Sequence, residues 1–342
     1  MSLVAQSVCK TDTGRIKPSE AGSIPALSAN LIYKGFKMKN FKDLIKINDE
    51  VLNALTSNKP IIALESTIIT HGMPYPENIN TAKEIEDIIR NYNVTPATIA
   101  IINGIIHIGL TNNEYDFITN NNNFFKANSA DLPVILSKKL NASTTVSASI
   151  LIANLIGIKF FVTGGIGGVH RNAHNTFDIS SDLTELSKTP ITVICAGPKA
   201  ILDIPKTLEY IETQNITHLN YKSDFLPAFY SADSPYKINH RVDSIQEISD
   251  IVINRELLRL NNSVLVTNPI PQESSIDFNE INLIIESAIK EANLNNIKGK
   301  LLTPFLLNYI KEKTNSKSLI ANIALIKNNA YLAAQIALEY FK

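Results

Sequence analysis

The side chains best suited to chemistry gather in the stretch Phe160–Lys199, where glycines, histidines, carboxylates, hydroxyls and a final lysine lie between two apolar runs. The first run, Lys159–Thr163, predicts a buried strand because it is rich in β-branched and aromatic residues. The second run, Ile191–Cys195, predicts another strand for the same reason. Open α/β sheets bind ligands beyond the carboxyl ends of their strands. The polar residues that follow both runs therefore predict a ligand site at this edge of a sheet.

Lys199 and Glu65 are the two candidate reacting groups. Lys199 follows an Ala-Gly-Pro turn and precedes an apolar segment, which predicts partial desolvation. Desolvation lowers the pKa of a lysine and makes a neutral, nucleophilic amine accessible. The alternative is a lysine whose stem lies along the surface. Glu65 ends the apolar run Ile61–Leu64, so it is either a general acid or base with a raised pKa or a carboxylate that caps a helix.

The glycine-rich segment 164–168 has two interpretations. Its backbone N–H groups could hold a phosphate, although it lacks the lysine and hydroxyl spacing of a P-loop. The alternative is a plain tight turn.

The carboxylates and hydroxyls after this segment offer oxygen ligands. Asp178, Ser180 and Asp182 suit a hard divalent cation, magnesium or manganese. The alternative is structural, with Ser180 or Ser181 capping a helix that begins near Asp182.

The histidines of the same segment give a weaker metal hypothesis. His170, His174, Asp178 and Asp182 recur every four residues and would share one face of a helix. The intervening asparagines and threonine favour a loop, which weakens the prediction of a zinc site.

Composition limits the partners of the chain. Lys plus Arg and Asp plus Glu are each 32 in 342 residues, so the formal net charge is zero and no basic face for nucleic acid is apparent. We therefore expect a small-molecule substrate. The cysteines are Cys9 and Cys195, too few for a disulfide framework, which predicts a reducing, cytoplasmic environment. The most apolar run, Val146–Val162, is interrupted by polar residues, so we expect no transmembrane segment and no membrane partner.

Alternating strand and helix signals predict one three-layer α/β/α domain with a mostly parallel central sheet over residues 38–342. The pattern predicts a helix from Asn40 to Leu55 and a polar connection over Thr111–Asn123. Residues 1–37 lack periodicity and are predicted to be a disordered extension, with organellar targeting by this segment left open.

Several long motifs give the chain a family resemblance. They are, in order, ALESTIITHGMP (Ala63–Pro74), PATIAIING (Pro96–Gly104), TGGIGGVHR (Thr163–Arg171), DISSDLTEL (Asp178–Leu186), CAGPKAILDIPKTLEYIET (Cys195–Thr213), NPIP (Asn268–Pro271) and TPFLL (Thr303–Leu307). From about Asn40 onward the chain resembles the pseudouridine-5′-phosphate glycosidases, the indigoidine synthase A-like family.

This resemblance implies reversible cleavage of the C–C glycosidic bond of pseudouridine 5′-phosphate to uracil and ribose 5-phosphate, with one Mn²⁺ or another divalent cation per subunit and a homotrimeric assembly. It implies that Lys199 forms a Schiff base with ring-opened ribose, that Glu65 is the proton donor and that Asp178 binds the metal. The positions implied for substrate binding are Lys126, Val146, Ser180, Ser181 and Asp182. Those implied around the sugar phosphate and base are Thr163, His170 and Asn322.

The chain departs from the family pattern at three places. Asn128-Ser129-Ala130-Asp131 stands where the family usually has Ser-Arg-Arg-Asp, which removes two cations. Asn172 replaces a usual glycine, which a left-handed backbone tolerates, and His174 stands where an acidic residue is common. These departures keep a second hypothesis open, a non-catalytic or altered-specificity sugar-phosphate binder. A ribokinase-type sugar kinase is a third, for which the chain offers no nucleotide-phosphate anion hole followed by a catalytic aspartate.

Overall fold

The computed structural model describes residues 41–121, 123–297 and 302–342. The predicted extension 1–37 lies outside the described residues. The strands are β1 (Ile45–Ile47), β2 (Ile61–Leu64), β3 (Thr95–Ile102), β4 (Ile105–Ile108), β5 (Phe125–Ala127), β6 (Ala142–Thr144), β7 (Phe160–Val162), β8 (Thr192–Cys195), β9 (Thr217–Tyr221), β10 (Arg241–Val242) and β11 (Val264–Thr267). The α-helices are α1 (Asp49–Thr56), α2 (Glu77–Asn91), α3 (Asn112–Thr119), α4 (Leu132–Ser137), α5 (Val146–Leu155), α6 (Ala173–Thr176), α7 (Ser181–Leu186), α8 (Ile204–Thr213), α9 (Ile245–Leu257), α10 (Phe278–Leu294), α11 (Leu302–Lys313) and α12 (Lys317–Tyr340).

The described strands form one sheet in the order β1-β4-β3-β2-β7-β8-β11-β9-β10, with β6 paired to β3 and β5 to β6. Every pairing is parallel except those of β3 with β4 and with β6. Within the central strands Leu64 pairs with Val162, and Val162 pairs with Ile194. The residues that follow β2, β7 and β8 therefore leave the sheet side by side at one edge.

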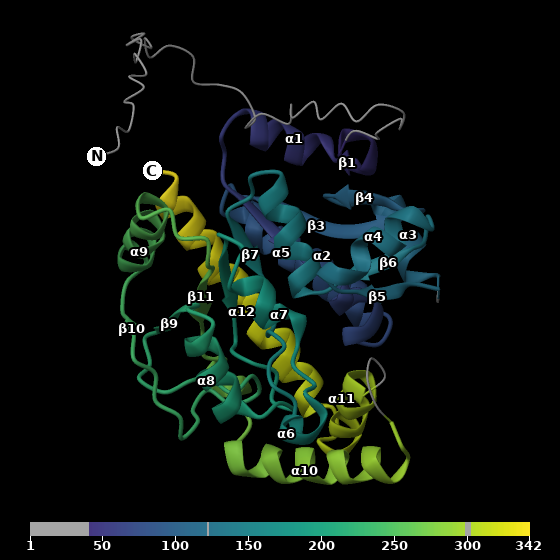
Figure 1. The fold of residues 1–342 in the computed structure, drawn as a ribbon, viewed down its shortest axis with the longest axis vertical. Coiled ribbons are helices and arrows are strands. Elements are labelled where there is room, and N and C mark those ends of the chain that lie inside the picture. The colour runs from purple at the N-terminus through teal and green to yellow at the C-terminus, as the bar shows by residue number, and fades with distance from the viewer. Residues whose placement is uncertain (1–40, 122, 298–301) are drawn as a thin grey trace, which may run out of the picture.

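Both faces of this sheet are covered by helices (Figure 1). Ile62 and Leu64 pack in the core that contains α2 and α12, whereas Ile61 and Ala63 pack in the core that contains α1 and α5. This alternation follows from the two-residue period of a strand, and burial of both faces explains why the central strands are apolar throughout. The predicted three-layer α/β/α fold with a mostly parallel sheet is confirmed.

The longest helix, α12, crosses the sheet and is yellow in Figure 1. Near its end, Tyr340 packs edge-on against Phe160 at the start of β7, with ring centroids 5.3 Å apart. Earlier in the helix, Asn322 lies beside Gly164, just past the end of β7. The helix therefore runs antiparallel to β7, and its first half reaches the edge where the polar residues gather.

Two predicted segments are wrong. The segment predicted as one helix from Asn40 to Leu55 contains strand β1, which pairs with β4 and so buries its apolar residues in the sheet rather than on a helical face. Asn48 then starts α1, because its side chain accepts a hydrogen bond from the Glu50 N–H at 2.9 Å. The predicted polar connection contains α3, which Thr111 and Glu114 start with reciprocal capping hydrogen bonds.

Within the described residues no helix combines the length and the apolar character that crossing a membrane requires.

Candidate active site

The ends of β2 and β7 place Glu65 beside Thr163. The Thr163 hydroxyl donates a hydrogen bond to Oε1 of Glu65. Thr163 is 1% exposed, so this contact lies away from solvent. Because Leu64 pairs with Val162, the parallel register itself brings these two next residues together.

Lys199 follows the neighbouring strand β8 and is held by its own backbone. Its N–H donates to the Ile166 carbonyl at 3.0 Å, and the Ile166 N–H donates to the Gly197 carbonyl at 3.2 Å. Gly197 has a positive φ of 86°, and a Cβ there would lie 2.3 Å from the Pro227 carbonyl oxygen. Only glycine fits this turn, which fixes the backbone before the half-buried lysine.

The electrostatics of Glu65 favour its protonated form. Burial raises the pKa of Glu65, and the Lys199 charge and the Thr163 hydrogen bond only partly offset that effect. The charge of Asp182 raises the same pKa further, and that of Lys126 lowers it. Glu65 is thus a carboxyl that keeps its proton to higher pH than an exposed glutamate, beside a lysine amine.

Lys126, on β5, contributes its positive charge to the same region. It helps burial to lower the pKa of His71 and of His170, so both imidazoles favour the neutral form. His71 is further positioned by the Thr70 hydroxyl, 2.6 Å from its Nδ1. The sequence indicated only a loop around His71. In the structure His71 lies in a π-helical turn, Ile68–Gly72, that follows β2 and Glu65.

Asp182 is buried, and its carboxylate binds two backbone segments. Its Oδ1 accepts a hydrogen bond from the Ser147 N–H at 3.0 Å, and its Oδ2 accepts one from the Gly167 N–H at 2.8 Å. A Cβ at Gly167 would lie 2.1 Å from the Ser180 hydroxyl oxygen, so glycine is required for this approach. The carboxylate therefore joins the first turn of α5 to the glycine-rich segment.

The structure also bears on the roles predicted for Ser180 and for the glycine-rich segment 164–168. Ser180 caps α7, with its hydroxyl accepting from the Asp182 N–H at 3.2 Å, as the structural alternative predicted. None of the glycines in segment 164–168 has a positive φ. Their role is close packing rather than a left-handed turn, and the Gly167 N–H is bound to protein rather than open to a phosphate.

A chain of hydroxyls connects α7, α5 and the segment that departs from the family pattern. The Ser181 and Ser147 hydroxyl oxygens are 3.1 Å apart, and the Ser129 N–H donates to the Ser147 hydroxyl at 3.3 Å. Asn128 and Asp131 hold that segment by reciprocal capping bonds. Val146 is fully buried and begins α5, so its backbone N–H lies in the first turn of that helix.

Asp178 lies at the more open side of the site. Its Oδ2 is 4.0 Å from Nδ1 of His170, and its side chain is 47% exposed. His174 is exposed on the short helix α6, whereas Asp182 is buried, so the four-residue spacing does not place these side chains on one face. Asn172 has a φ of 71°, the left-handed backbone that the sequence predicted to be tolerated there.

Across residues 41–121, 123–297 and 302–342 no group of three or more His, Cys, Asp or Glu side chains is arranged to hold a metal ion. Cys195 is fully buried in β8, and burial raises its thiol pKa to about 12, as expected for inert core.

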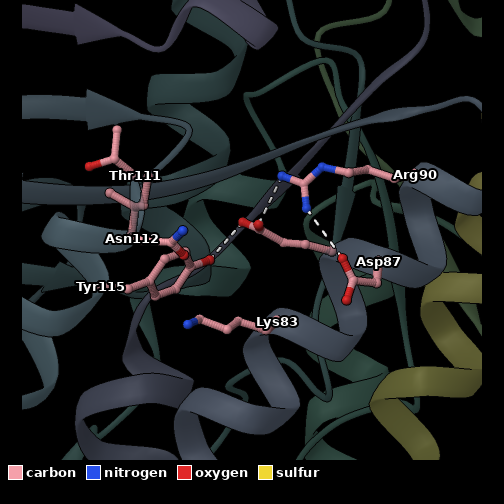
Figure 2. Close-up of a pocket in the computed structure, with 8 residues that line it drawn as sticks. Lys83, Asp87, Arg90, Thr111, Asn112 and Tyr115 are labelled. Atoms are coloured by element: carbon pink, nitrogen blue, oxygen red, sulfur yellow. Dashed lines mark hydrogen bonds and ion pairs between the residues drawn. The ribbon is translucent and has the colours of Figure 1, made fainter.

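Two cavities lie away from these groups. The larger, about 460 Å³, lies between α2 and the start of α3 (Figure 2). Its buried carboxylate, Glu86, accepts hydrogen bonds from Thr98 and Tyr115, both at 2.6 Å, and from Arg90 at 3.1 Å. The smaller, about 330 Å³, is lined by Arg171, Asp203 and apolar residues of α10. Arg171 is itself bound to the Asn282 side chain at 2.7 Å.

Fold and site together define an α/β enzyme scaffold in which a lysine and a protonatable carboxyl, electrostatically coupled to each other, lie at the carboxyl edge of a parallel sheet. The family described as "Indigoidine synthase A like protein" matches residues 50–339. A curated pseudouridine-5′-phosphate glycosidase of Petrotoga mobilis is 52% identical over 301 residues, which cover 88% of this chain and 98% of the relative. One of Geobacillus kaustophilus is 49% identical over 297 residues, which cover 87% and 99%.

Two solved structures share the fold. The prealnumycin C-glycosynthase AlnA, in complex with ribulose 5-phosphate, has a TM-score of 0.81 and 30% identity, over 87% of this chain and 97% of that one. An indigoidine synthase A-like protein from Thermotoga maritima has a TM-score of 0.80 and 32% identity over the same shares. The chain belongs to the indigoidine synthase A-like family, the family of the pseudouridine-5′-phosphate glycosidases.

Proposed function

We propose that this protein is a pseudouridine-5′-phosphate glycosidase, which reversibly cleaves the C–C glycosidic bond of pseudouridine 5′-phosphate to give uracil and ribose 5-phosphate. The names of relatives about half identical over nearly their whole length support this reaction, and so does the C-glycosynthase name of a structural neighbour. The observation that carries it is Glu65, held by Thr163 and electrostatically coupled to Lys199.

The chemistry explains why these two groups belong together. The Lys199 amine forms a bond to C1′ of the ribose while the C1′–O4′ bond breaks, and the ring oxygen takes up a proton. Glu65 then donates a proton to C5 of uracil. The electrons of the C1′–C5 bond return to the pyrimidine ring, and the lysine nitrogen lone pair forms the imine. Water hydrolyses the imine, which releases ribose 5-phosphate and restores the amine. A raised pKa suits Glu65 to the donor step, because the carboxyl keeps its proton to higher pH than an exposed glutamate does.

The substrate-binding part of the proposal assigns a cation and several polar groups to the sugar phosphate. Lys126 supplies the cation, and the Val146 N–H and the hydroxyls of Ser180 and Ser181 supply hydrogen bonds. Asp182 holds the surrounding backbone in place, because both of its carboxylate oxygens are already bound to backbone N–H groups.

The metal part of the proposal assigns one Mn²⁺ to Asp178. An exposed carboxylate with His170 nearby fits a hard cation whose remaining ligands are waters, since manganese accepts carboxylate and water oxygens. When bound, the ion would stabilise negative charge that develops on the substrate.

The homotrimer and the cytoplasmic location remain predictions. The exposed leucines Leu257 and Leu258 at the end of α9, 74% and 69% exposed, are an apolar surface that an assembly would cover. Sedimentation equilibrium of the purified chain tests the trimer.

The function is tested by incubating the purified protein with pseudouridine 5′-phosphate and manganese and following uracil release. Borohydride reduction with ribose 5-phosphate should add the sugar to the peptide that contains Lys199, and Lys199→Ala should abolish both signals. Lys188→Ala is a matched control, because Lys188 is an exposed lysine of the same region that pairs only with Glu185 in the described chain. Uracil release that persists in Lys199→Ala would refute the lysine mechanism, and no release by the wild type would favour the non-catalytic hypothesis.

A further inference from the structure

Asn329, in the middle of α12, supports the backbone just past β7. Its Nδ2 donates to the Thr163 carbonyl at 2.9 Å and to the Gly164 carbonyl at 3.4 Å. Asn329 is fully buried. Carbonyls that leave a strand lose their ladder partners, and a buried carbonyl without a donor is costly. The Gly164 carbonyl also accepts a hydrogen bond from the Ala196 N–H at 2.8 Å, so the Asn329 amide matters most for the Thr163 carbonyl.

The orientation of that amide is fixed from its other side. Asn268, which follows β11 and is 5% exposed, donates from its Nδ2 to Oδ1 of Asn329 at 3.2 Å. A flipped Asn329 amide would place its oxygen against the two carbonyls and its NH₂ against another NH₂ donor. The buried pair therefore has one favourable arrangement, in which α12 and β11 together hold the segment after β7.

That segment carries the hydroxyl that binds Glu65. Thr163 offers its carbonyl to Asn329 and its hydroxyl to Glu65, so the two contacts share one residue. Gly164, the next residue, leaves room for α12 at this point, because a Cβ there would lie 3.3 Å from Cδ1 of Leu325. A shift of Thr163 would thus be transmitted directly to the Glu65 carboxyl.

We propose that Asn329 is a positioning residue for catalysis, which acts through Thr163 to fix the carboxyl of Glu65. The proposal deepens the proposed function and rests on Glu65 as the proton-transfer group. The other charges that face Glu65 are those of Lys199, Asp182 and Lys126, and none of them is bound by Asn329.

The adjacent residue provides a matched control. Asn328 donates from its Nδ2 to the Pro269 carbonyl at 2.9 Å, on the loop after β11. Asn328→Ala therefore removes the same kind of helix-to-loop hydrogen bond one position away without touching Thr163. Both variants should lose stability, whereas only Asn329→Ala should change the chemistry.

The test is steady-state kinetics with pseudouridine 5′-phosphate across pH. Asn329→Ala should lower kcat about tenfold with KM within about twofold, since the lost interaction orients a reacting group rather than binding substrate. The pH limb assigned to Glu65 should move to higher pH, because a misplaced Thr163 hydroxyl no longer lowers its pKa. In a Thr163→Val background the same substitution should add less than about twofold, since the two residues act in series.

Equal losses in Asn329→Ala and Asn328→Ala, an unmoved limb, or full additivity with Thr163→Val would overturn the proposal and leave Asn329 a structural residue. If Asn329→Ala does not fold, Asn268→Ala frees the amide while leaving it in place and should move the limb in the same direction with a smaller loss of kcat. An unmoved limb in that variant overturns the proposal as well. Glu65→Gln tests the proposed function separately from the role of Asn329, because activity retained in this variant would refute the role of Glu65 itself.

Discussion

Glu65, which follows β2, and Glu86, in the middle of α2, each accept a hydrogen bond from a threonine, but their surroundings differ. Glu86 is 5% exposed and binds Thr98, Tyr115 and Arg90. Glu65 is partly buried and, within the described residues, accepts a hydrogen bond only from Thr163. Burial and the neighbouring carboxylate raise the pKa of Tyr115 well above its usual range, which keeps it a donor to Glu86. Burial raises the pKa of Glu65 because its donors do not fully compensate.

The difference shows that a buried carboxylate is chemically useful when its solvation by the protein is incomplete. Glu86, which accepts three hydrogen bonds, lines the cavity between α2 and the start of α3, and the proposed reacting pair Glu65 and Lys199 lies outside it. This cavity is therefore not the proposed site. The two carboxyls differ in the donors that bind them, and the few donors of Glu65 leave the effect of burial on its pKa only partly offset.

The largest contrast should appear in turnover. Glu65→Gln should lower kcat by about 10³, since an amide cannot donate the proton and general acid catalysis is worth about 10² to 10⁴. Glu86→Gln, measured by the same uracil-release assay, should keep activity within about threefold after correction for folded protein. Comparable losses in the two variants would show that the two carboxylates are not functionally distinct.

Stability should respond in the opposite sense. Glu86→Gln should lower the free energy of unfolding by about 2 kcal/mol, because an amide nitrogen must then face either Arg90 or the two hydroxyl donors. Glu65→Gln should stabilise the protein, because it removes an ionisation that the folded state disfavours.

The sign of this gain depends on pH. A carboxyl with a raised folded pKa destabilises the folded state as pH rises from the ordinary value of 4.5 through the folded value. The gain should therefore be absent near pH 4 and present at neutral pH. Urea unfolding at both pH values measures it. A gain that is equal at both would contradict the raised pKa.

Removal of the proposed metal ligand near Glu65 should have an intermediate effect. Asp178→Asn should weaken manganese binding about tenfold, since it replaces a charged oxygen ligand with a neutral one of the same size. Calorimetry measures the affinity, and excess manganese should partly restore turnover. The control is His174→Ala, whose side chain is exposed on α6. Metal binding lost in His174→Ala and retained in Asp178→Asn would favour the histidine-ligand hypothesis instead.

The smallest expected effect is a shift in a pH profile. Thr163→Val should move the limb assigned to Glu65 to higher pH, because the hydrogen bond that it removes lowers the Glu65 pKa. The direction is the same whether Glu65 acts protonated or ionised. Thr98→Val removes the equivalent donor from Glu86 and should leave the profile unchanged. A shift in the second variant alone would reverse the comparison.

The sequence by itself determined much of the scaffold and singled out the two proposed reacting groups. Apolar runs of the right length predicted β2 and β8, and both Glu65 and Lys199 were predicted at strand ends because polarity changes abruptly there. Local patterns failed where a local signal was outweighed or overlooked. The segment Ile45–Ile47 is a strand because β4 pairs with it, and α3 was missed although its capping residues, Thr111 and Glu114, were present.

Only the tertiary structure decided which polar groups meet. Glu65 and Thr163 are 98 positions apart, and Thr163 and Asn329 are 166 apart, so no local pattern relates them. The order β2-β7-β8 makes the first pair neighbours, and the antiparallel crossing of α12 brings in the second. The sequence likewise offers no sign that Glu86 is saturated and Glu65 is not. Hydrogen bonding and desolvation act over a few ångströms in space, and the chain's distant segments come within that range only when the sheet is assembled.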